Sequence, residues 1–180
     1  MDSEIAVGPL NRFLDDFAVG DVHRFPLGRT VNEADNSWFA LLTMNTNQLH
    51  FNAEFAARTE FGRPLVNSGF SVALVLGMSV SDLSANATAN LGWTDIELVA
   101  PLFVGDTVYT ESLVTGVRPS VSRPGSGVVS VVTRGLNQHG VEFLRFRRTF
   151  LVPDRAHRLG VFPDPVVSIG AERCGGSADV

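Results

Sequence analysis

The sequence predicts an α+β domain in which a bent antiparallel sheet wraps one apolar helix. Residues 68–82 are apolar almost all round, so a helix there has to be enclosed by other elements. The second half of the chain holds four segments rich in valine, threonine and aromatic residues, separated by turn signals. One enclosed helix with a sheet around it buries both sets of apolar residues.

The composition fits one domain without a nucleic-acid or membrane role. The chain has 180 residues, a hydrophobic fraction of 44% and a formal net charge of −5, which disfavours nucleic-acid binding. A single cysteine, Cys174, excludes an intrachain disulfide and a cysteine-based zinc site. The first residues lack signal-peptide features, and no apolar run is long enough to cross a membrane, so we expect a cytoplasmic protein. We place the domain at 19–155, between a lead-in at 1–18 and a polar tail at 156–180 that we expect to fray.

The first half of the domain begins with an extended segment and continues with helices. Residues 19–31 read as extended, and their proline suits a sheet edge. Asn32 can cap a helix whose first turn holds Glu33 and Asp35. Asn52 can cap a second, short helix before the apolar one. The apolar residues of the first helix recur at helical spacing, namely Ala34, Trp38, Leu41 and Leu42.

The four predicted strands span 91–102, 106–117, 127–137 and 141–152. In the last strand one face is apolar, with Leu144, Phe146, Phe150 and Val152. Arg145 and Arg147 share the other face. Arg148 falls on the apolar face, where it either snorkels to water at a sheet edge or contacts another subunit or a ligand.

The loop that follows the first helix contains a single histidine among several asparagines. Residues 42–50 read LTMNTNQLH, and FGRPL at 61–65 precedes Asn67 and Ser68. With NEAD at 32–35 and PLFVGDTV at 101–108, this order resembles the MaoC-like hydratases, the R-specific enoyl-CoA hydratases of the hotdog fold. The resemblance covers residues 18–153.

This resemblance implies a hydratase or dehydratase that acts on a coenzyme A thioester. The family has an aspartate five residues before its histidine, and here these positions are Asn45 and His50. Met44 stands at the family's glycine, Gln48 at its proline, and Asn67-Ser68 at its His-Gly. The resemblance also implies at least a homodimer joined at sheet edges, and no cofactor besides the coenzyme A of the substrate.

Hydration requires a base for water and a donor for the enolate oxygen of the thioester. Histidine changes protonation near neutral pH, so His50 is the catalytic candidate, with Asn45 orienting the water. The resemblance implies that the backbone N–H of Ser68, at the helix start, is the donor. Asn47 either contacts the substrate or only forms a turn. The further substrate-binding candidates are Arg63, Asn67 and Gly69.

Three functions remain open. The first is enoyl-CoA hydration. The TMN at 43–45 resembles relatives that hydrate branched C5 dicarboxylic thioesters such as mesaconyl-CoA or itaconyl-CoA, and Arg63 could hold their second carboxylate. The second is a hotdog thioesterase, which needs a carboxylate that Asn45 does not supply. The third is a non-catalytic protein that binds coenzyme A thioesters. No spacing indicates a metal site or a nucleotide fingerprint. Candidate cations for the phosphates of coenzyme A are Arg118, Arg123, Arg145, Arg147 and Arg148.

Overall fold

The computed structural model describes residues 12–158. The calls made on residues 1–11 and 159–180, Cys174 included, lie outside the described residues. The strands are β1 (Val22–Arg24), β2 (Arg29–Thr30), β3 (Ala89–Leu98), β4 (Thr107–Pro119), β5 (Ser126–Leu136) and β6 (Glu142–Pro153). The helices are α1 (Glu33–Leu42), α2 (Ala53–Ala57) and α3 (Ser68–Ser79), which continues as a π-helical turn at Val80–Ser84. Short 3-10 turns span Leu14–Asp16, Gln48–His50 and Arg155–His157.

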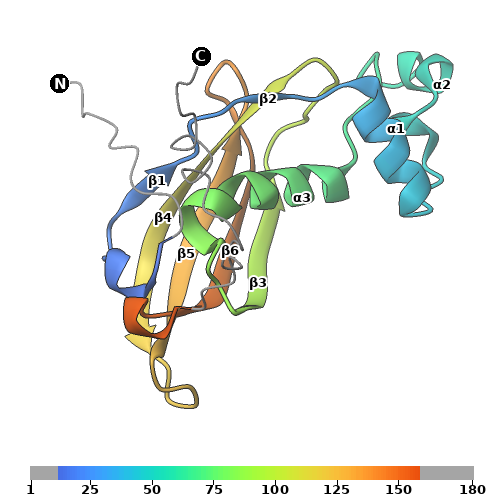
Figure 1. The fold of residues 1–180 in the computed structure, drawn as a ribbon. Coiled ribbons are helices and arrows are strands. Elements are labelled where there is room, and N and C mark those ends of the chain that lie inside the picture. Colours follow the sequence, from blue (N-terminus) through green and yellow to red (C-terminus); the bar gives the residue numbers. More distant parts are fainter. Residues whose placement is uncertain (1–11, 159–180) are drawn as a thin grey trace, which may run out of the picture.

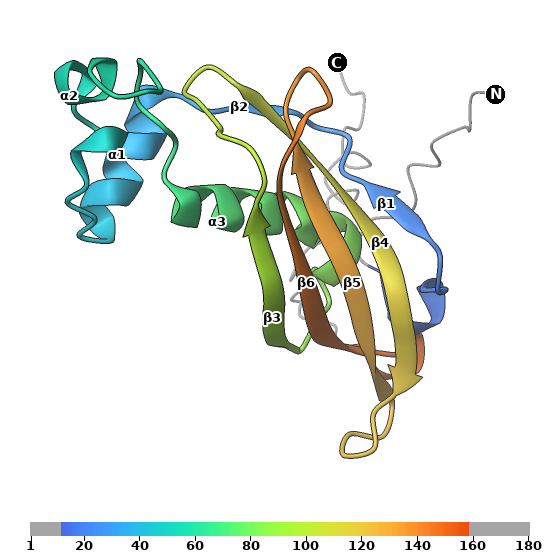
Figure 2. The same cartoon turned by 180° about the vertical axis from the view of Figure 1, so that it is seen from behind.

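The strands form one antiparallel sheet in the order β1-β4-β5-β6-β3, with β2 pairing to the other end of β4. The sheet curves around α3, while α1 and α2 stand beyond the β3 side of the sheet (Figures 1 and 2). The predicted bent sheet around one central helix is therefore confirmed. The first long strand begins two residues earlier and ends four residues earlier than predicted, so residues 99–102 are left to run toward α3 as irregular chain.

The core lies between α3 and the inner face of the sheet. The predicted alternation in β6 is confirmed, because Leu144, Phe146, Phe150 and Val152 are fully buried. On α3 the side chains of Val75 and Met78 pack into this core. A strand with one apolar face can bury that face against a helix while the other face meets water.

The prediction that α3 is enclosed on all sides was too broad. Gly69, Ala73, Gly77 and Val80 form a stripe along the helix, and this stripe is exposed in the single chain. A Cβ added to Gly77 would meet no atom within 4 Å. The apolar sequence of this helix therefore includes both a buried face and a stripe that the described chain leaves exposed.

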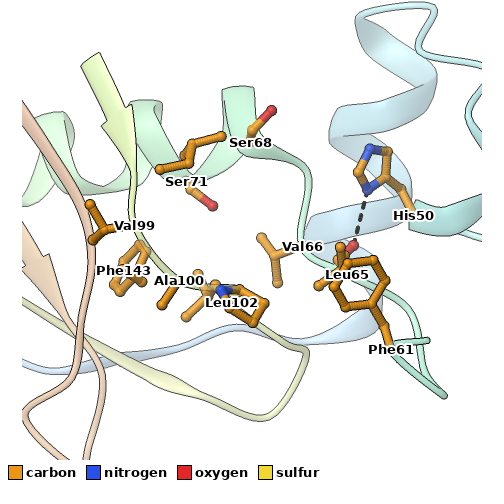
Figure 3. Close-up of a pocket in the computed structure, with 12 residues that line it drawn as sticks. His50, Phe61, Leu65, Val66, Ser68, Ser71, Val99, Ala100, Leu102 and Phe143 are labelled. Atoms are coloured by element: carbon orange, nitrogen blue, oxygen red, sulfur yellow. Dashed lines mark hydrogen bonds between the residues drawn. The ribbon is translucent and has the colours of Figure 1, made fainter. Parts of the chain in front are cut away.

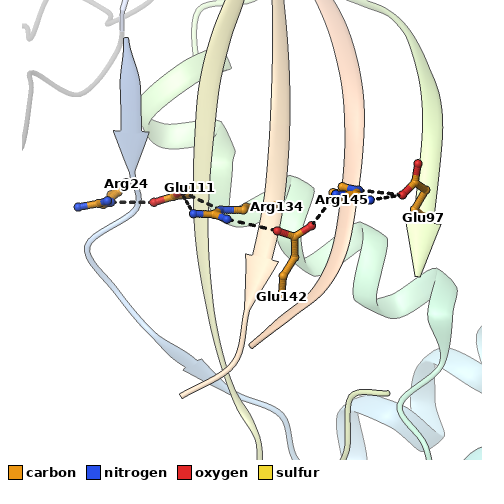
Figure 4. Close-up of polar contacts among 6 residues, drawn as sticks. All are labelled: Arg24, Glu97, Glu111, Arg134, Glu142 and Arg145. Carbon is orange, nitrogen blue, oxygen red and sulfur yellow. Dashed lines mark hydrogen bonds and ion pairs between the residues drawn. The ribbon is translucent and has the colours of Figure 1, made fainter. Parts of the chain in front are cut away.

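The outer face of the sheet carries a row of ion pairs that crosses five strands (Figure 4). From β1 to β3 the row contains Arg24, Glu111, Arg134, Glu142, Arg145 and Glu97. Opposite charges on neighbouring strands favour one register of pairing over its one-residue slips. The row also uses Arg145, which the sequence offered as a contact for coenzyme A.

Helix α1 forms where predicted, but it buries a different face. Asn32 caps it by accepting a hydrogen bond from Asp35 N at 2.9 Å. The buried residues of α1 are Asn36 and Ala40, whereas Trp38, Leu41 and Leu42 are exposed. The exposed fractions of those side chains are 67% for Trp38, 71% for Leu41 and 77% for Leu42. The apolar spacing predicted the helix correctly, and the structure shows which of its residues are buried.

The segment before β1 packs on the sheet. Phe17 is buried and meets the ring of Phe150 edge-on at 5.9 Å. Arg155, just after β6, pairs with Asp16. Residues 12–18 of the expected lead-in thus contribute to the core. Within the described part of the chain, no helix has the length and apolar character needed to cross a membrane.

Candidate active site

His50 closes a short 3-10 turn at Gln48–His50, which leads from α1 toward α2. Its Nδ1 lies 3.1 Å from the carbonyl oxygen of Leu65 (Figure 3). A carbonyl oxygen only accepts, so Nδ1 carries the hydrogen of this bond. In the neutral ring the other nitrogen, Nε2, is then left with a free lone pair. The histidine is therefore held in the form that can take a proton through Nε2.

His50 borders a cavity of about 430 Å³ between the loop and the start of α3 (Figure 3). The cavity is mostly apolar, and none of the residues that line it is acidic. Its polar side chains besides His50 are Ser68 and Ser71, both from α3. The apolar lining includes Phe61, Leu65, Val66, Leu102 and Phe143. A small acyl group beside a histidine is what such a cavity suits.

The first turn of α3 leaves one backbone donor free at this cavity. Asn67 caps the helix, and its Oδ1 accepts hydrogen bonds from Gly69 N at 2.9 Å and Phe70 N at 3.4 Å. Among residues 12–158, Ser68 N–H has no acceptor. The N-terminus of a helix favours negative charge, so this N–H is suited to receive an oxyanion. Asn67 itself is buried, and its Nδ2 also has no partner within the described residues.

Asn36 holds the pieces of this site together and was missed by the sequence reasoning. It lies on α1 and is 1% exposed. Its Nδ2 donates to His50 O at 2.7 Å and to Leu65 O at 2.9 Å. Its Oδ1 accepts from Asn67 N at 2.8 Å. The only sequence signal was a polar residue between the apolar positions of a predicted helix.

Asn45 and Asn47 form hydrogen bonds within the loop and do not line the cavity. Asn45 Oδ1 accepts a hydrogen bond from Asn47 N at 3.0 Å. Asn47 Oδ1 accepts one from Leu49 N at 3.1 Å and caps the turn that ends at His50. Both asparagines bond to nearby backbone, as loop asparagines commonly do. Their predicted roles toward water and substrate stay predictions.

The backbone at Met44 adopts a conformation that favours glycine, and glycine is the residue of the MaoC-like pattern at this position. Its φ is +54°, in the left-handed region that glycine enters freely and other residues enter at a cost. The side chain of Met44 is 86% exposed.

Arg63 lies at a second cavity of about 480 Å³, next to the first and sharing Pro101 with it. Its guanidinium sits 3.9 Å above the ring of Phe103. Among residues 12–158 it has no carboxylate partner. The second cavity also contains Asp106, whose carboxylate accepts hydrogen bonds from Phe103 N and Gln138 Nε2, both at 2.9 Å.

The other arginines are placed away from the cavity. Arg145 and Arg147 lie on the outer face in ion pairs with Glu97 and Asp95. Arg118 and Arg123 belong to the hairpin that joins β4 and β5, at the end of the sheet away from α1 and α2 (Figure 1). These positions do not favour a role in binding the phosphates of a thioester at His50.

Arg148 does not snorkel. It is 3% exposed, and its Nη2 donates to Ser84 Oγ at 3.2 Å. Burial lowers the pKa of Arg148 to about 10. Its neighbours are core residues and the end of the α3 segment, so it is a buried cation remote from the cavity.

Among the residues that the structure describes, no three His, Cys, Asp or Glu side chains gather as metal ligands. The described site consists of one histidine, one free helix N–H and an apolar cavity. These features can move one proton and stabilise one developing negative charge.

A sheet wrapped around one helix, with a loop histidine and the first residue of that helix lining one cavity, defines a hotdog domain. The same architecture occurs in a conserved hypothetical protein of Mycobacterium tuberculosis described as a double hotdog fold, with a TM-score of 0.74 at 23% identity over 93% of this chain and 52% of that one. The chain belongs to the family of the MaoC like domain, whose model matches residues 16–135.

Two relatives link the domain to thioester chemistry. A mesaconyl-CoA hydratase of Cereibacter sphaeroides is 35% identical over 144 residues, which cover 80% of this chain and 42% of the relative. An (R)-specific enoyl-CoA hydratase of Aeromonas caviae is 32% identical over 114 residues, which cover 63% of this chain and 81% of the relative. The chain thus spans less than half the length of the first relative and most of the second.

Proposed function

We propose that this protein adds water to the double bond of an enoyl-CoA thioester, or removes it in the reverse direction. One observation carries the proposal. The Nδ1 of His50 donates to Leu65 O, which leaves Nε2 as a base at the cavity where Ser68 begins α3. The two hydratases among its relatives support the same chemistry.

In the proposed reaction His50 Nε2 takes a proton from water while the water oxygen bonds to the β-carbon. The electrons of the double bond move toward the thioester, whose oxygen accepts a hydrogen bond from Ser68 N–H. The imidazolium then returns the proton to the α-carbon, and the carbonyl re-forms. His50 acts as base and acid in turn, so no carboxylate is required for proton balance.

We further propose a short branched acyl group, with mesaconyl-CoA as the first candidate. Its support is the name of the Cereibacter relative and a cavity of about 430 Å³, which has room for a C5 acyl group. Arg63, in the neighbouring cavity, is proposed to hold an anionic part of the substrate, either a second carboxylate or a phosphate. Asn67 Nδ2 and the Gly69 backbone are proposed substrate contacts at the helix start, and Asn45 and Asn47 act there through the loop.

A non-catalytic protein that binds thioesters is the second candidate. It is favoured by the position of Asn45, whose side-chain oxygen is engaged by Asn47 N and which does not line the cavity. A thioesterase is disfavoured because, among residues 12–158, no acidic side chain lines the cavity to act as its nucleophile or base.

The test is incubation of the protein with crotonyl-CoA, mesaconyl-CoA and itaconyl-CoA. Loss of enoyl-thioester absorbance with the gain of one water by mass is the expected result. Release of free coenzyme A, measured with a thiol reagent, would show that the protein hydrolyses the thioester and does not hydrate the double bond. Binding without either reaction would assign the non-catalytic role.

A homodimer joined at the β3 edge is proposed as the working unit. β3 has an unpaired edge in the described chain, and its exposed residues include Leu91, Trp93, Ile96 and Leu98. The exposed stripe of α3 and the exposed Trp38, Leu41 and Leu42 of α1 add to this uncovered apolar surface. Helix α1 stands beyond the β3 side of the sheet (Figure 1). In this proposal a second copy covers all three surfaces.

Light scattering at micromolar concentration tests the dimer. Ala73→Arg puts a charge on the open stripe of α3 and should shift the protein to monomer. Val121→Arg, on the exposed tip of the β4–β5 hairpin, is the matched control and should stay dimeric. A monomeric wild type would overturn the proposal. The cytoplasmic location stays a prediction, which cell fractionation would test.

A further inference from the structure

The buried amide of Asn36 connects three segments that otherwise belong to different elements. One hydrogen of Nδ2 goes to the carbonyl of His50, and the other goes to the carbonyl of Leu65. Oδ1 receives the N–H of Asn67. Carbonyl oxygens only accept and a backbone N–H only donates, so the amide has one allowed orientation. Each of its three bonds is between 2.7 and 2.9 Å.

These segments carry the two groups that the proposed reaction uses. The Leu65 carbonyl that accepts from Asn36 also accepts from His50 Nδ1, which orients the ring of the base. Asn67 is the cap of α3 and directly precedes the free N–H of Ser68. Asn36 therefore touches the backbone of the base, the carbonyl that orients the base and the residue before the oxyanion donor.

Other hydrogen bonds stabilise the His50 turn and the start of α3 separately, and few of them join these two segments. The His50 turn is closed by His50 N donating to Asn47 O at 3.2 Å. The start of α3 is closed by Asn67 Oδ1. Apart from Asn36 and the His50 ring, the described backbone link between the loop and the approach to α3 is Leu65 N donating to Leu49 O at 3.2 Å.

We propose that Asn36 is a positioning residue that sets the separation of the His50 ring from the Ser68 N–H and holds the ring in its Nδ1–H form. The proposal rests on the proposed hydration. A residue that only filled space at this point could be apolar, because leucine has the same branched arrangement of side-chain heavy atoms as asparagine. The amide is needed because two carbonyls and one N–H converge there and have to be satisfied away from water.

The first experiment compares Asn36→Leu with Asn86→Leu. Asn86 is a matched control, since its Nδ2 also donates to a backbone carbonyl, that of Arg12 at 3.2 Å, and it lies beyond the other end of α3. Asn36→Leu should lower kcat on the order of 100-fold with KM changed less than about 3-fold, because a small displacement of reacting groups costs about that much. Asn86→Leu should keep kcat within about 2-fold.

The second experiment reads the histidine directly and does not need activity. Nitrogen chemical shifts of the His50 ring report which nitrogen carries the hydrogen. Wild type should show the Nδ1–H form, and Asn36→Leu should show a mixture with the Nε2–H form. If wild type does not hydrate enoyl thioesters, the proposed function fails while the ring spectrum still decides the role of Asn36.

Asn36→Asp provides a third comparison. It keeps the oxygen that accepts from Asn67 N and loses both donors, and its charge faces two carbonyls. Its rate relative to wild type should fall as the pH rises through the titration of the new carboxyl and recover in part when that carboxyl holds a proton. A folded Asn36→Leu with kcat within 3-fold of wild type, or a wild-type ring in the Nε2–H form, would overturn the proposal.

Discussion

The side-chain oxygen of Asn45 accepts a hydrogen bond from the backbone N–H of Asn47 at 3.0 Å. This bond sits at the position where the MaoC-like pattern has its aspartate. A carboxylate accepts such a bond as well as an amide does, so the turn does not depend on which of the two is present. The loop that carries His50 can therefore form with either an asparagine or an aspartate at position 45.

Asn45→Asp tests whether the site accepts a second acid–base group. It should keep the turn, leave the midpoint of urea unfolding unchanged, and keep or raise the rate on crotonyl-CoA. Asn45→Ala removes the acceptor, and since one lost hydrogen bond costs about 1–3 kcal/mol, the rate should fall about 10-fold. Steady-state kinetics of the three proteins give the answer.

An inert wild type with an active Asn45→Asp would mean that the natural protein binds thioesters without hydrating them. In that case the family's chemistry would have been lost at this single residue.

His50→Ala should abolish measurable hydration, because His50 is the side chain placed to carry the proton at the cavity. The fold should persist, since the ring is only half-buried and lies on a loop. His157→Ala, in the exposed turn that follows β6, is the control with full activity expected. If His50→Ala retained its rate, the site would lie elsewhere.

The fold could be predicted because its signals are local and repeated. The alternation of β6 and the caps of α1 and α2 each follow from a few neighbouring residues, and Asn52 does accept from Phe55 N at 3.1 Å. The position of His50 beside the start of α3 came from a family pattern. No periodicity of this sequence would have placed them together.

The features that the sequence did not predict depend on contacts between distant segments. Asn36 bonds to residues 14, 29 and 31 positions away, and a lone asparagine on a helix gives no sign of such partners. The buried side of α1 does not follow from its apolar spacing, because the described chain leaves Trp38, Leu41 and Leu42 exposed and buries Asn36 and Ala40. The position of Arg63 depends on the path of the chain after β3, which a strand pattern does not specify.

Met44→Gly should stabilise the loop. A left-handed conformation costs a residue with a side chain about 1–2 kcal/mol, and glycine in the unfolded chain gives back about 0.5–1 kcal/mol of that gain. The expected net gain is about 0.5–1 kcal/mol in the free energy of urea unfolding. Leu42→Gly, two residues earlier at the end of α1, should instead destabilise by about 1 kcal/mol. A less stable Met44→Gly would show that the methionine side chain makes contacts in the assembly that outweigh the strain.

The start of α1 should weaken in acid. Hydrogen bonds from Arg29, at 2.7 and 2.8 Å, lower the pKa of Asp35, and the bond from Asn32 N lowers it further. A depressed carboxyl pKa contributes stability above its unfolded value of about 3.9, and this is lost as the pH falls through the folded value. Asp35→Asn should therefore cost about 1 kcal/mol at pH 7, and the gap from wild type should close progressively below about pH 4. A gap that stays constant with pH would exclude the ion pair as its source.

Arg148 provides a test of buried charge in this core. Its pKa is lowered to about 10 by burial, so at pH 7 the cation persists and its desolvation counts against the folded state. Its polar contact is Ser84 Oγ, its guanidinium lies 4.9 Å from the ring of Phe150, and its Nε has no partner among residues 12–158. Arg148→Met keeps much of the apolar volume and removes the charge.

We expect Arg148→Met to leave stability unchanged or raise it by about 1 kcal/mol at pH 7, since replacing buried charge by packed apolar atoms is often neutral or favourable. Because the folded pKa lies below the unfolded one, wild type recovers its penalty as the pH rises above 10, and any advantage of the variant should shrink there. Denaturant unfolding at pH 7 and pH 10.5 measures both effects. A loss of more than about 2 kcal/mol on substitution would contradict the expectation, because removing a cation costs that much only when an anion opposes it. That anion would have to come from outside residues 12–158, and repeating the measurement at protein concentrations above and below the dimer dissociation range would show whether a second copy supplies it.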